Sequence, residues 1–110
     1  MLRKTELLKG TTEMILLSLL KEKDMYGYEL TELLRQVSND YLQLKEGTLY
    51  PALKKLEEKE LVKSYWKDSF EGPRRKYYYI TKLGFQELEA YVNQWKDFQV
   101  IIQNIIEYRR

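Results

Sequence analysis

The side chains best suited to bind another molecule are cations and hydroxyl groups in the middle of this chain. Three adjacent cations, Arg74-Arg75-Lys76, follow a Gly-Pro turn signal and repel one another unless an anion lies near. A second set shares one predicted helix and comprises Thr48, Tyr50, Lys54 and Lys55. Lysine and arginine bind phosphate oxygens, and hydroxyl groups reach base edges. Together these residues predict a surface for double-stranded DNA, and the Tyr28 hydroxyl is a further candidate to donate a hydrogen bond to a phosphate.

Simpler interpretations of the same residues stay open. The cations can be a solvated charge run, Tyr50 can cap the edge of a core, and Tyr28 can be a packing residue. The net charge of +2 is too small to decide between DNA binding and these simpler interpretations. The surplus positive charge lies in residues 45–76, which carry nine basic and six acidic side chains and so a net charge of +3. The net charge is −1 for residues 1–44 and zero for residues 77–110.

The composition argues against catalysis and metal binding. The 110 residues contain neither histidine, the commonest general base, nor cysteine, and both are usual zinc ligands. Five scattered glycines form no phosphate-binding loop. We therefore expect no enzyme activity, no cofactor and no metal site, and a cysteine-free chain suits the reducing cytoplasm. No apolar run approaches the roughly 20 residues that span a bilayer, so we expect no membrane partner.

The spacing of apolar residues places these side chains on a few elements. A cap at Thr11 or Thr12 and an almost wholly apolar run predict a helix to about Glu22. Spacings of three and four predict helices from Tyr28 to about Gln36 and from about Lys45 to about Lys59. Residues that favour β-structure predict strands over 61–67 and 76–81, which form a hairpin with a basic tip. This order predicts an α+β fold, a winged helix-turn-helix with a two-stranded wing. The third helix would enter the major groove of DNA.

A long helix completes the expected fold. From Lys82 the helical period holds to the C-terminus over about 28 residues, or roughly 40 Å. Such a helix overhangs a small domain, so its apolar stripe needs a partner, most simply a second copy. The chain then divides into a DNA-binding domain, residues 1–81, and a dimerisation helix, residues 82–110. The predicted dimer interface comprises Leu16, Leu20, Tyr91, Trp95, Phe98, Ile102, Ile105 and Ile106.

Four motifs follow one another in a recognisable order. They are Met25-Tyr26-Gly27-Tyr28-Glu29-Leu30, then residues 46–57, residues 72–78 and Ile80-Thr81-Lys82-Leu83-Gly84. They closely resemble the PadR family of bacterial transcriptional regulators, over about residues 9–106. The single long C-terminal helix is similar to the small PadR subgroup. The resemblance implies a homodimeric repressor that a small molecule or another signal releases from its operator, which we expect to be pseudo-palindromic. Pro73 departs from the family, where a second glycine is common, and would stiffen the wing.

The same resemblance points to a binding site for an effector. Multidrug-responsive members of the subgroup carry a tryptophan on this helix at the dimer centre, and Trp95 falls at the matching place. Facing its own copy across a gap, Trp95 could stack on a planar aromatic or cationic small molecule. The other predicted effector-binding residues are Met14, Leu88, Val92 and Gln99. Trp95 could instead be an ordinary interface anchor, because tryptophan is enriched at interfaces.

The sequence therefore predicts a sequence-specific DNA-binding transcriptional regulator, a repressor relieved by a small aromatic or cationic ligand. Two alternatives lack operator binding. A winged helix used only for protein interaction would not need the cations at 74–76. A ligand-sequestering module would need Trp95 but neither Tyr50 nor Lys54.

Overall fold

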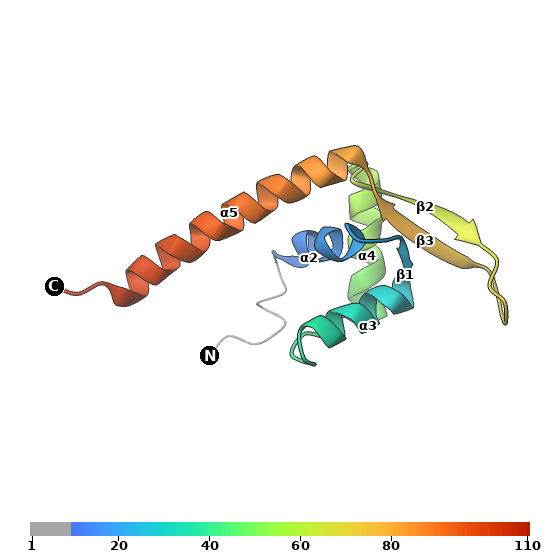
Figure 1. Ribbon diagram of the computed structural model, residues 1–110, viewed down its shortest axis with the longest axis horizontal. Coiled ribbons are helices and arrows are strands. Elements are labelled where there is room, and N and C mark those ends of the chain that lie inside the picture. Colours follow the sequence, from blue (N-terminus) through green and yellow to red (C-terminus); the bar gives the residue numbers. More distant parts are fainter. Residues whose placement is uncertain (1–9) are drawn as a thin grey trace.

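The computed structural model describes residues 10–110, which form four helices and three strands (Figure 1). In chain order the elements are α2 (Thr12–Leu20), β1 (Met25–Tyr26), α3 (Gly27–Val37), α4 (Glu46–Glu58), β2 (Val62–Lys67), β3 (Arg75–Ile80) and α5 (Lys82–Glu107). This order confirms the α+β class and the sequence of three helices, a hairpin and a long helix. Residues 1–9 of the predicted DNA-binding domain lie outside the described part of the chain.

The strands form one antiparallel sheet in the order β1-β3-β2. Tyr78 at the middle of β3 pairs with Met25 on one side and with Ser64 on the other. The sequence did not predict β1, because two residues are too few to show the alternation of a strand. This strand matters because it ties the start of α3 to the wing, the hairpin of β2 and β3 (residues 62–80).

The turn from α4 into the wing and the start of α5 are joined by hydrogen bonds. Glu60 adopts a left-handed backbone, φ 62°, and the Leu61 N–H then donates to the Leu56 carbonyl at 3.0 Å, which closes the end of α4. The Thr81 hydroxyl donates to the Glu60 carbonyl at 2.8 Å and accepts from the Gly84 N–H at 2.9 Å. One threonine therefore caps α5 and holds it against the end of α4.

The hydrophobic core lies where α2, α3, α4, the sheet and the first turns of α5 meet. Its buried members are Leu16, Leu17, Leu20, Met25, Leu30, Leu34, Leu44, Leu49, Leu53, Leu56, Leu61, Val62, Tyr78 and Leu88. Leu16 and Leu20 expose only 0% and 1% of their surface. Their predicted place in the dimer interface is wrong, because the protomer itself already buries them.

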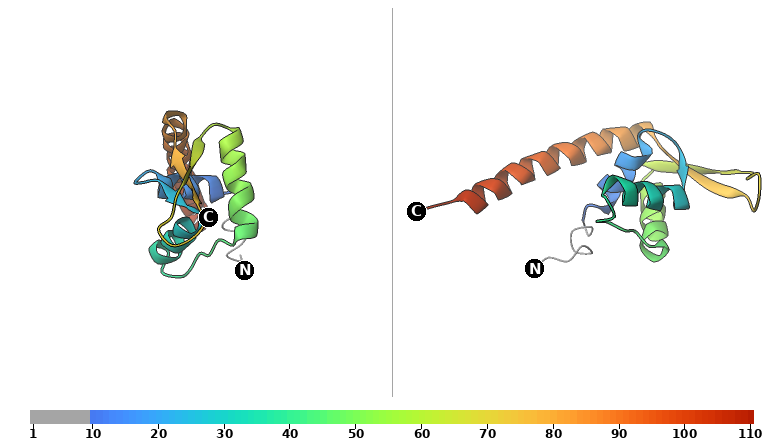
Figure 2. Two further views of the ribbon diagram at one scale, coloured as in Figure 1. Left: turned by 90° about the vertical axis from the view of Figure 1, so that its right-hand side faces the viewer. Right: turned by 60° about the horizontal axis from the view of Figure 1, so that its bottom comes forward.

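Helix α5 leaves this body as an arm (Figures 1 and 2). The molecule measures 63 × 29 × 21 Å and its radius of gyration is 16.0 Å, against about 13 Å for a compact chain of this size. The first turns of α5 pack on α2, with Leu88 in the core and Tyr91 and Val92 against it. The core thus extends past residue 81, and the division of the chain at that point stays a prediction. None of the helices in residues 10–110 is both long and apolar enough to cross a membrane.

Candidate nucleic-acid interface

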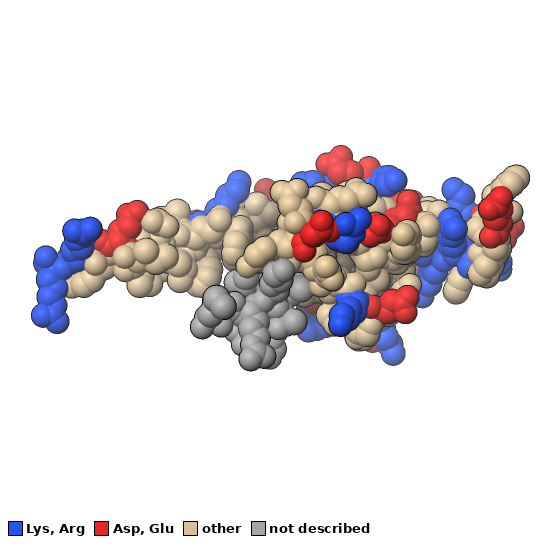
Figure 3. Space-filling model, turned by 90° about the horizontal axis from the view of Figure 1, so that it is seen from below, with Lys and Arg blue, Asp and Glu red and all other residues tan. Residues whose placement is uncertain are grey.

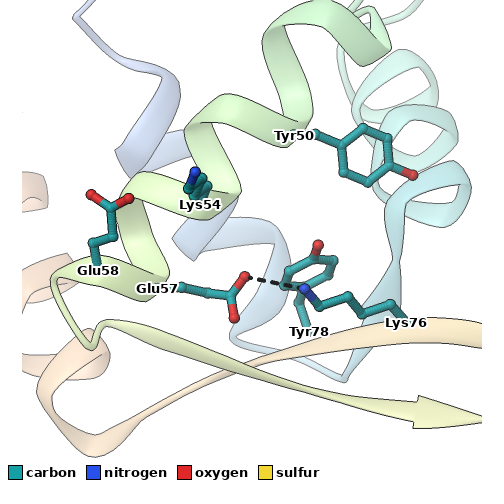
Figure 4. A pocket seen from close by; sticks show the side chains of 6 residues that line it. All are labelled: Tyr50, Lys54, Glu57, Glu58, Lys76 and Tyr78. Carbon is teal, nitrogen blue, oxygen red and sulfur yellow. Dashed lines mark ion pairs between the residues drawn. The ribbon is translucent and has the colours of Figure 1, made fainter.

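One side of α4 faces the wing across an open cleft of about 550 Å³. The cleft is lined by Tyr50, Lys54, Glu57, Glu58, Lys76 and Tyr78 (Figure 4). Tyr50 and Lys54 are four residues apart and so lie on the same side of the helix, and both are exposed. Two of the predicted contact residues on α4 therefore share a surface with the wing.

Tyr50 owes its position to a glycine. Its ring is 44% exposed, and its hydroxyl lies over Gly27, the first residue of α3. A Cβ atom at Gly27 would come within 2.4 Å of the Tyr50 Oη atom, so a larger residue there would displace the ring. Nearly half of the Tyr50 side chain thus remains exposed to solvent, where a partner can reach it.

The other predicted contacts on the helices divide into two groups. Thr48 is exposed in the first turn of α4, and Tyr28 is exposed at the start of α3, where its ring stacks on Tyr26 with centroids 6.4 Å apart. Lys55 lies elsewhere: its Nζ atom is 3.9 Å from Glu13 of α2, and it lines a different cleft together with Tyr91 of α5. The structure therefore separates Lys55 from the Tyr50–Lys54 surface.

Of the three cations that the sequence places at a basic tip, only Arg74 lies in the turn of the wing. Arg75 and Lys76 belong to β3, opposite Lys67 and Trp66 of β2, and adjacent strand residues point to opposite faces of the sheet. Arg74 pairs with Asp68 at 3.4 Å. The turn itself carries Asp68, Glu71 and a fully exposed Phe70. The charge therefore runs along the strands, and Figure 3 shows basic side chains across the wing and acidic ones at its outer end.

The two cations of β3, Arg75 and Lys76, have partners of different kinds. The Arg75 guanidinium lies 4.5 Å from the centroid of the Tyr26 ring, whereas the Lys76 Nζ atom lies 3.6 Å from the Glu57 carboxylate of α4. A ring leaves the charge of Arg75 uncancelled, whereas a carboxylate offsets that of Lys76. Arg75 is therefore better able than Lys76 to attract an anion.

A second cleft of about 490 Å³ adjoins the first, between the wing and the start of α3. Its lining includes the aromatic residues Tyr26, Tyr50, Trp66 and Tyr78 and the cations at 74–76. Burial, followed by the charges of Glu57 and Tyr50, raises the pKa of Tyr78 to about 12, so its hydroxyl stays protonated at neutral pH. Sequence reasoning missed Tyr26 and Trp66. The alternation of β2 could have placed Trp66 on the same face as Lys76.

Comparison with known proteins identifies the family to which this protein belongs. The model of the transcriptional regulator PadR-like family matches residues 16–90. The chain belongs to this family. Members of the PadR-like family are transcription regulators and not enzymes.

Several relatives of this PadR-like chain match it over nearly its whole length. It is 38% identical over 104 residues to an uncharacterised protein of Lysinibacillus sphaericus, covering 94% of this chain and 95% of the relative. A transcriptional regulator from Clostridium thermocellum superposes with a TM-score of 0.85 at 32% identity, covering 93% of this chain and 99% of that chain. A PadR family regulator from Eggerthella lenta gives a TM-score of 0.85 at 31% identity, covering 96% and 89%.

The predicted effector residues of this PadR-like chain are only partly accessible. Leu88 is 7% exposed and belongs to the core, so its predicted contact with a ligand is wrong. Met14 and Val92 pack against the core. Trp95 is 40% exposed, with its ring 6.4 Å from that of Phe98, and Gln99 is exposed one turn further along α5. Trp95 and Gln99 therefore keep most of the surface that a ligand would need.

The outer half of α5 carries the apolar surface expected of an interface. The predicted interface residues that stay exposed there are Trp95, Phe98, Ile102, Ile105 and Ile106, and Val100 and Ile101 add to them. Tyr91, by contrast, donates its hydroxyl to Glu13 of its own chain at 2.6 Å. So many exposed apolar side chains on one helix are unusual on a monomer and mark a site of association.

Proposed function

We propose that this PadR-like regulator binds double-stranded DNA with α4 in the major groove and with the wing against the neighbouring backbone. The observation that carries the proposal is the surface shared by Tyr50 and Lys54 of α4 and the cations of β3. The major groove is wide enough to admit a helix. Tyr50 and Thr48 are close to base edges in this arrangement, and Lys54 and Arg75 meet phosphates. Arg74 and Lys76, each paired with a carboxylate, contribute less.

The regulator acts as a homodimer in this proposal. The exposed isoleucines of α5 support a dimer. Their burial against a second copy would stabilise the pair by about 25 cal/mol per Å² of apolar surface. A two-fold dimer presents two copies of α4 to a pseudo-palindromic operator, whose half-sites lie about 34 Å apart. The protein then works in the cytoplasm, where bacterial DNA is found.

We further propose that the protein is a repressor whose operator affinity falls when a planar aromatic or cationic molecule binds beside Trp95. The half-exposed indole offers such a molecule a stacking surface. A ligand held between two α5 helices changes the spacing of the two α4 helices only if it prefers one form of the dimer. The alternatives without operator binding give no role to the cleft between α4 and the wing.

Two neighbouring lysines provide the test of DNA binding. Lys54→Ala removes a cation of the interface, whereas Lys55→Ala removes one that faces Glu13 and α5. With the duplex upstream of the protein's own gene as probe, fluorescence anisotropy should show weaker binding for Lys54→Ala. Its slope of log affinity against log salt should be smaller by about 0.9, and Lys55→Ala should retain the native slope. Equal losses in both variants, or no binding by the native protein at moderate salt, would reject the interface.

Fluorescence tests whether a ligand binds beside Trp95. The chain has two tryptophans, and Trp66 lies on the wing, so Trp66→Phe leaves Trp95 as the only indole. Titration with a planar cationic dye should quench this emission, and the same dye should release DNA from the native protein. A dye that releases DNA without quenching Trp95 acts elsewhere, which would contradict the proposed pocket.

A further inference from the structure

Three helices meet at one carboxylate, that of Glu13 in α2. The Tyr91 hydroxyl of α5 donates to Glu13 Oε2 at 2.6 Å. The Lys59 Nζ atom, at the end of α4, donates to both carboxylate oxygens, at 2.9 and 3.0 Å. Glu13 thus joins the helix proposed to read DNA to the helix proposed to form the dimer, across 46 and 78 residues of sequence.

The surroundings of Glu13 make these bonds strong. Its side chain is only 18% exposed. Burial by itself raises the pKa of Glu13, but hydrogen bonds from Tyr91 and Lys59 and the charges of Lys59 and Lys55 lower it below the ordinary value. Glu13 is therefore ionised at neutral pH and accepts charge-assisted hydrogen bonds, which are shorter and stronger than neutral ones.

Apolar packing alone would not set the angle between α4 and α5. Leu88, Tyr91 and Val92 hold α5 against the core, but hydrophobic contact is non-directional and allows a helix to roll or slide slightly. Hydrogen bonds to one carboxylate are directional and lose strength when a donor moves. The Thr81 hydrogen bonds fix only the start of α5 at the end of α4. The Glu13 network is thus a second directional link between the two helices, farther along α5.

We infer that Glu13 is a positioning residue that sets the angle of α4 relative to α5 through Lys59 and Tyr91. In the dimer, this angle determines how far apart the two α4 helices lie, and so which half-site spacing is accepted. The inference rests on the proposed function. It also gives a physical route by which a change in the packing of α5 would reach α4, and it assigns Glu13 no contact with DNA.

Removal of a single oxygen atom tests this role. Tyr91→Phe keeps the ring and its packing but removes the donor to Glu13, and Tyr108→Phe, at the exposed end of the same helix, is the matched control. The probe is a duplex selected from a random pool by the native protein. Base pairs are then added or removed between its half-sites, and the affinity for each spacing is measured.

The native protein should discriminate sharply among spacings, and Tyr91→Phe should reduce this discrimination about fivefold. Glu13→Gln should act in the same direction, and Tyr108→Phe should not. A role in stability alone would lower the melting temperature and weaken binding at every spacing alike. Unchanged discrimination in Tyr91→Phe would therefore overturn the inference, whereas a native protein that binds no duplex would overturn the proposed function instead.

A second measurement needs no DNA. Because the chain has no cysteine, spin labels can be attached at Glu58→Cys on α4 and Asp97→Cys on α5 alone. With labelled protein diluted by unlabelled protein, double electron–electron resonance reports the distance between the two helices of one protomer. Tyr91→Phe should broaden the distance distribution, and Tyr108→Phe should leave it narrow. Equal widths in both variants would reject the positioning role even if DNA binding is confirmed.

Discussion

At the scale of single residues, two glycines in helical first turns meet different neighbours. A Cβ atom at Gly27 would approach the hydroxyl end of Tyr50 to 2.4 Å, whereas one at Gly84 would approach the Leu61 carbonyl oxygen to 2.1 Å. The side chain of Tyr50 can swing away, but the Leu61 backbone is held by the Thr81 hydrogen bonds at the start of α5. The same substitution should therefore affect function at one site and stability at the other.

Gly84→Ala should lower the free energy of unfolding by about 1–3 kcal/mol, because the new methyl group overlaps a fixed backbone oxygen. Gly27→Ala should unfold close to the native temperature but bind duplex DNA roughly five- to tenfold more weakly, because Tyr50 loses its position. Circular dichroism and anisotropy measure the two effects. A large loss of stability in Gly27→Ala would contradict the mobility assigned to Tyr50.

Ionisation of the Glu13 carboxylate should make the stability of the fold depend on pH. Its pKa is lowered in the folded chain, where Lys59, Lys55 and Tyr91 face it, so its contribution is complete above the unfolded value of about 4.5. The contribution is lost as the pH falls through the lower folded value. Denaturation in urea at neutral pH and near pH 3.5 should show a larger loss for the native protein than for Glu13→Gln. Equal losses would mean that Glu13 is not the titrating group.

At the scale of elements, the wing carries its charge along the strands. Arg75 lies against a ring and Lys76 against Glu57, so two neighbouring cations contribute differently to the field that DNA would meet. The wing also reaches α4 through this ion pair and α3 through the pairing of β1 with β3. Its position relative to the DNA-facing side of α4 is therefore set by the ion pair with α4 and by the strand pairing along the edge of β3.

Arg75→Gln should reduce the salt dependence of DNA binding by about 0.9 in slope, because one phosphate contact is lost. Lys76→Gln should change the slope less, because this lysine is already paired with Glu57. Affinity measured over a series of salt concentrations compares the two variants. Equal slopes would contradict the assignment of Arg75 as the principal phosphate contact of β3.

At the scale of the whole molecule, a compact body carries an extended helical arm. The body buries its leucines in a single core, whereas the outer half of α5 leaves most of its isoleucines in solvent. On the face shown in Figure 3 this arm is mostly uncharged. Water-exposed apolar surface on an extended helix is unfavourable, and association with a second α5 would remove it.

Ile105→Asp should convert the proposed dimer to monomers, because association would bury an unpaired carboxylate. Sedimentation should show native protein at twice the 13.4 kDa mass of the protomer and the variant at that mass. Ile105→Leu, which keeps an apolar side chain, should remain a dimer. A native protein that sediments as a monomer at micromolar concentration would contradict the proposed assembly.

Local pattern in the sequence determined most of the elements. An apolar run after a threonine cap predicted α2, apolar spacings of three and four predicted α3, α4 and α5, and the Gly-Pro turn between β-forming runs predicted the wing. The motifs also gave the family. What tertiary structure decided is which surface each residue occupies. Leu16 and Leu20 lie in the protomer core, Lys55 faces Glu13, and Arg75 and Lys76 lie in β3. A helical or strand period does not say which neighbouring element covers a face. The link through Glu13 joins residues 46 and 78 positions apart, and only the folded chain brings them together.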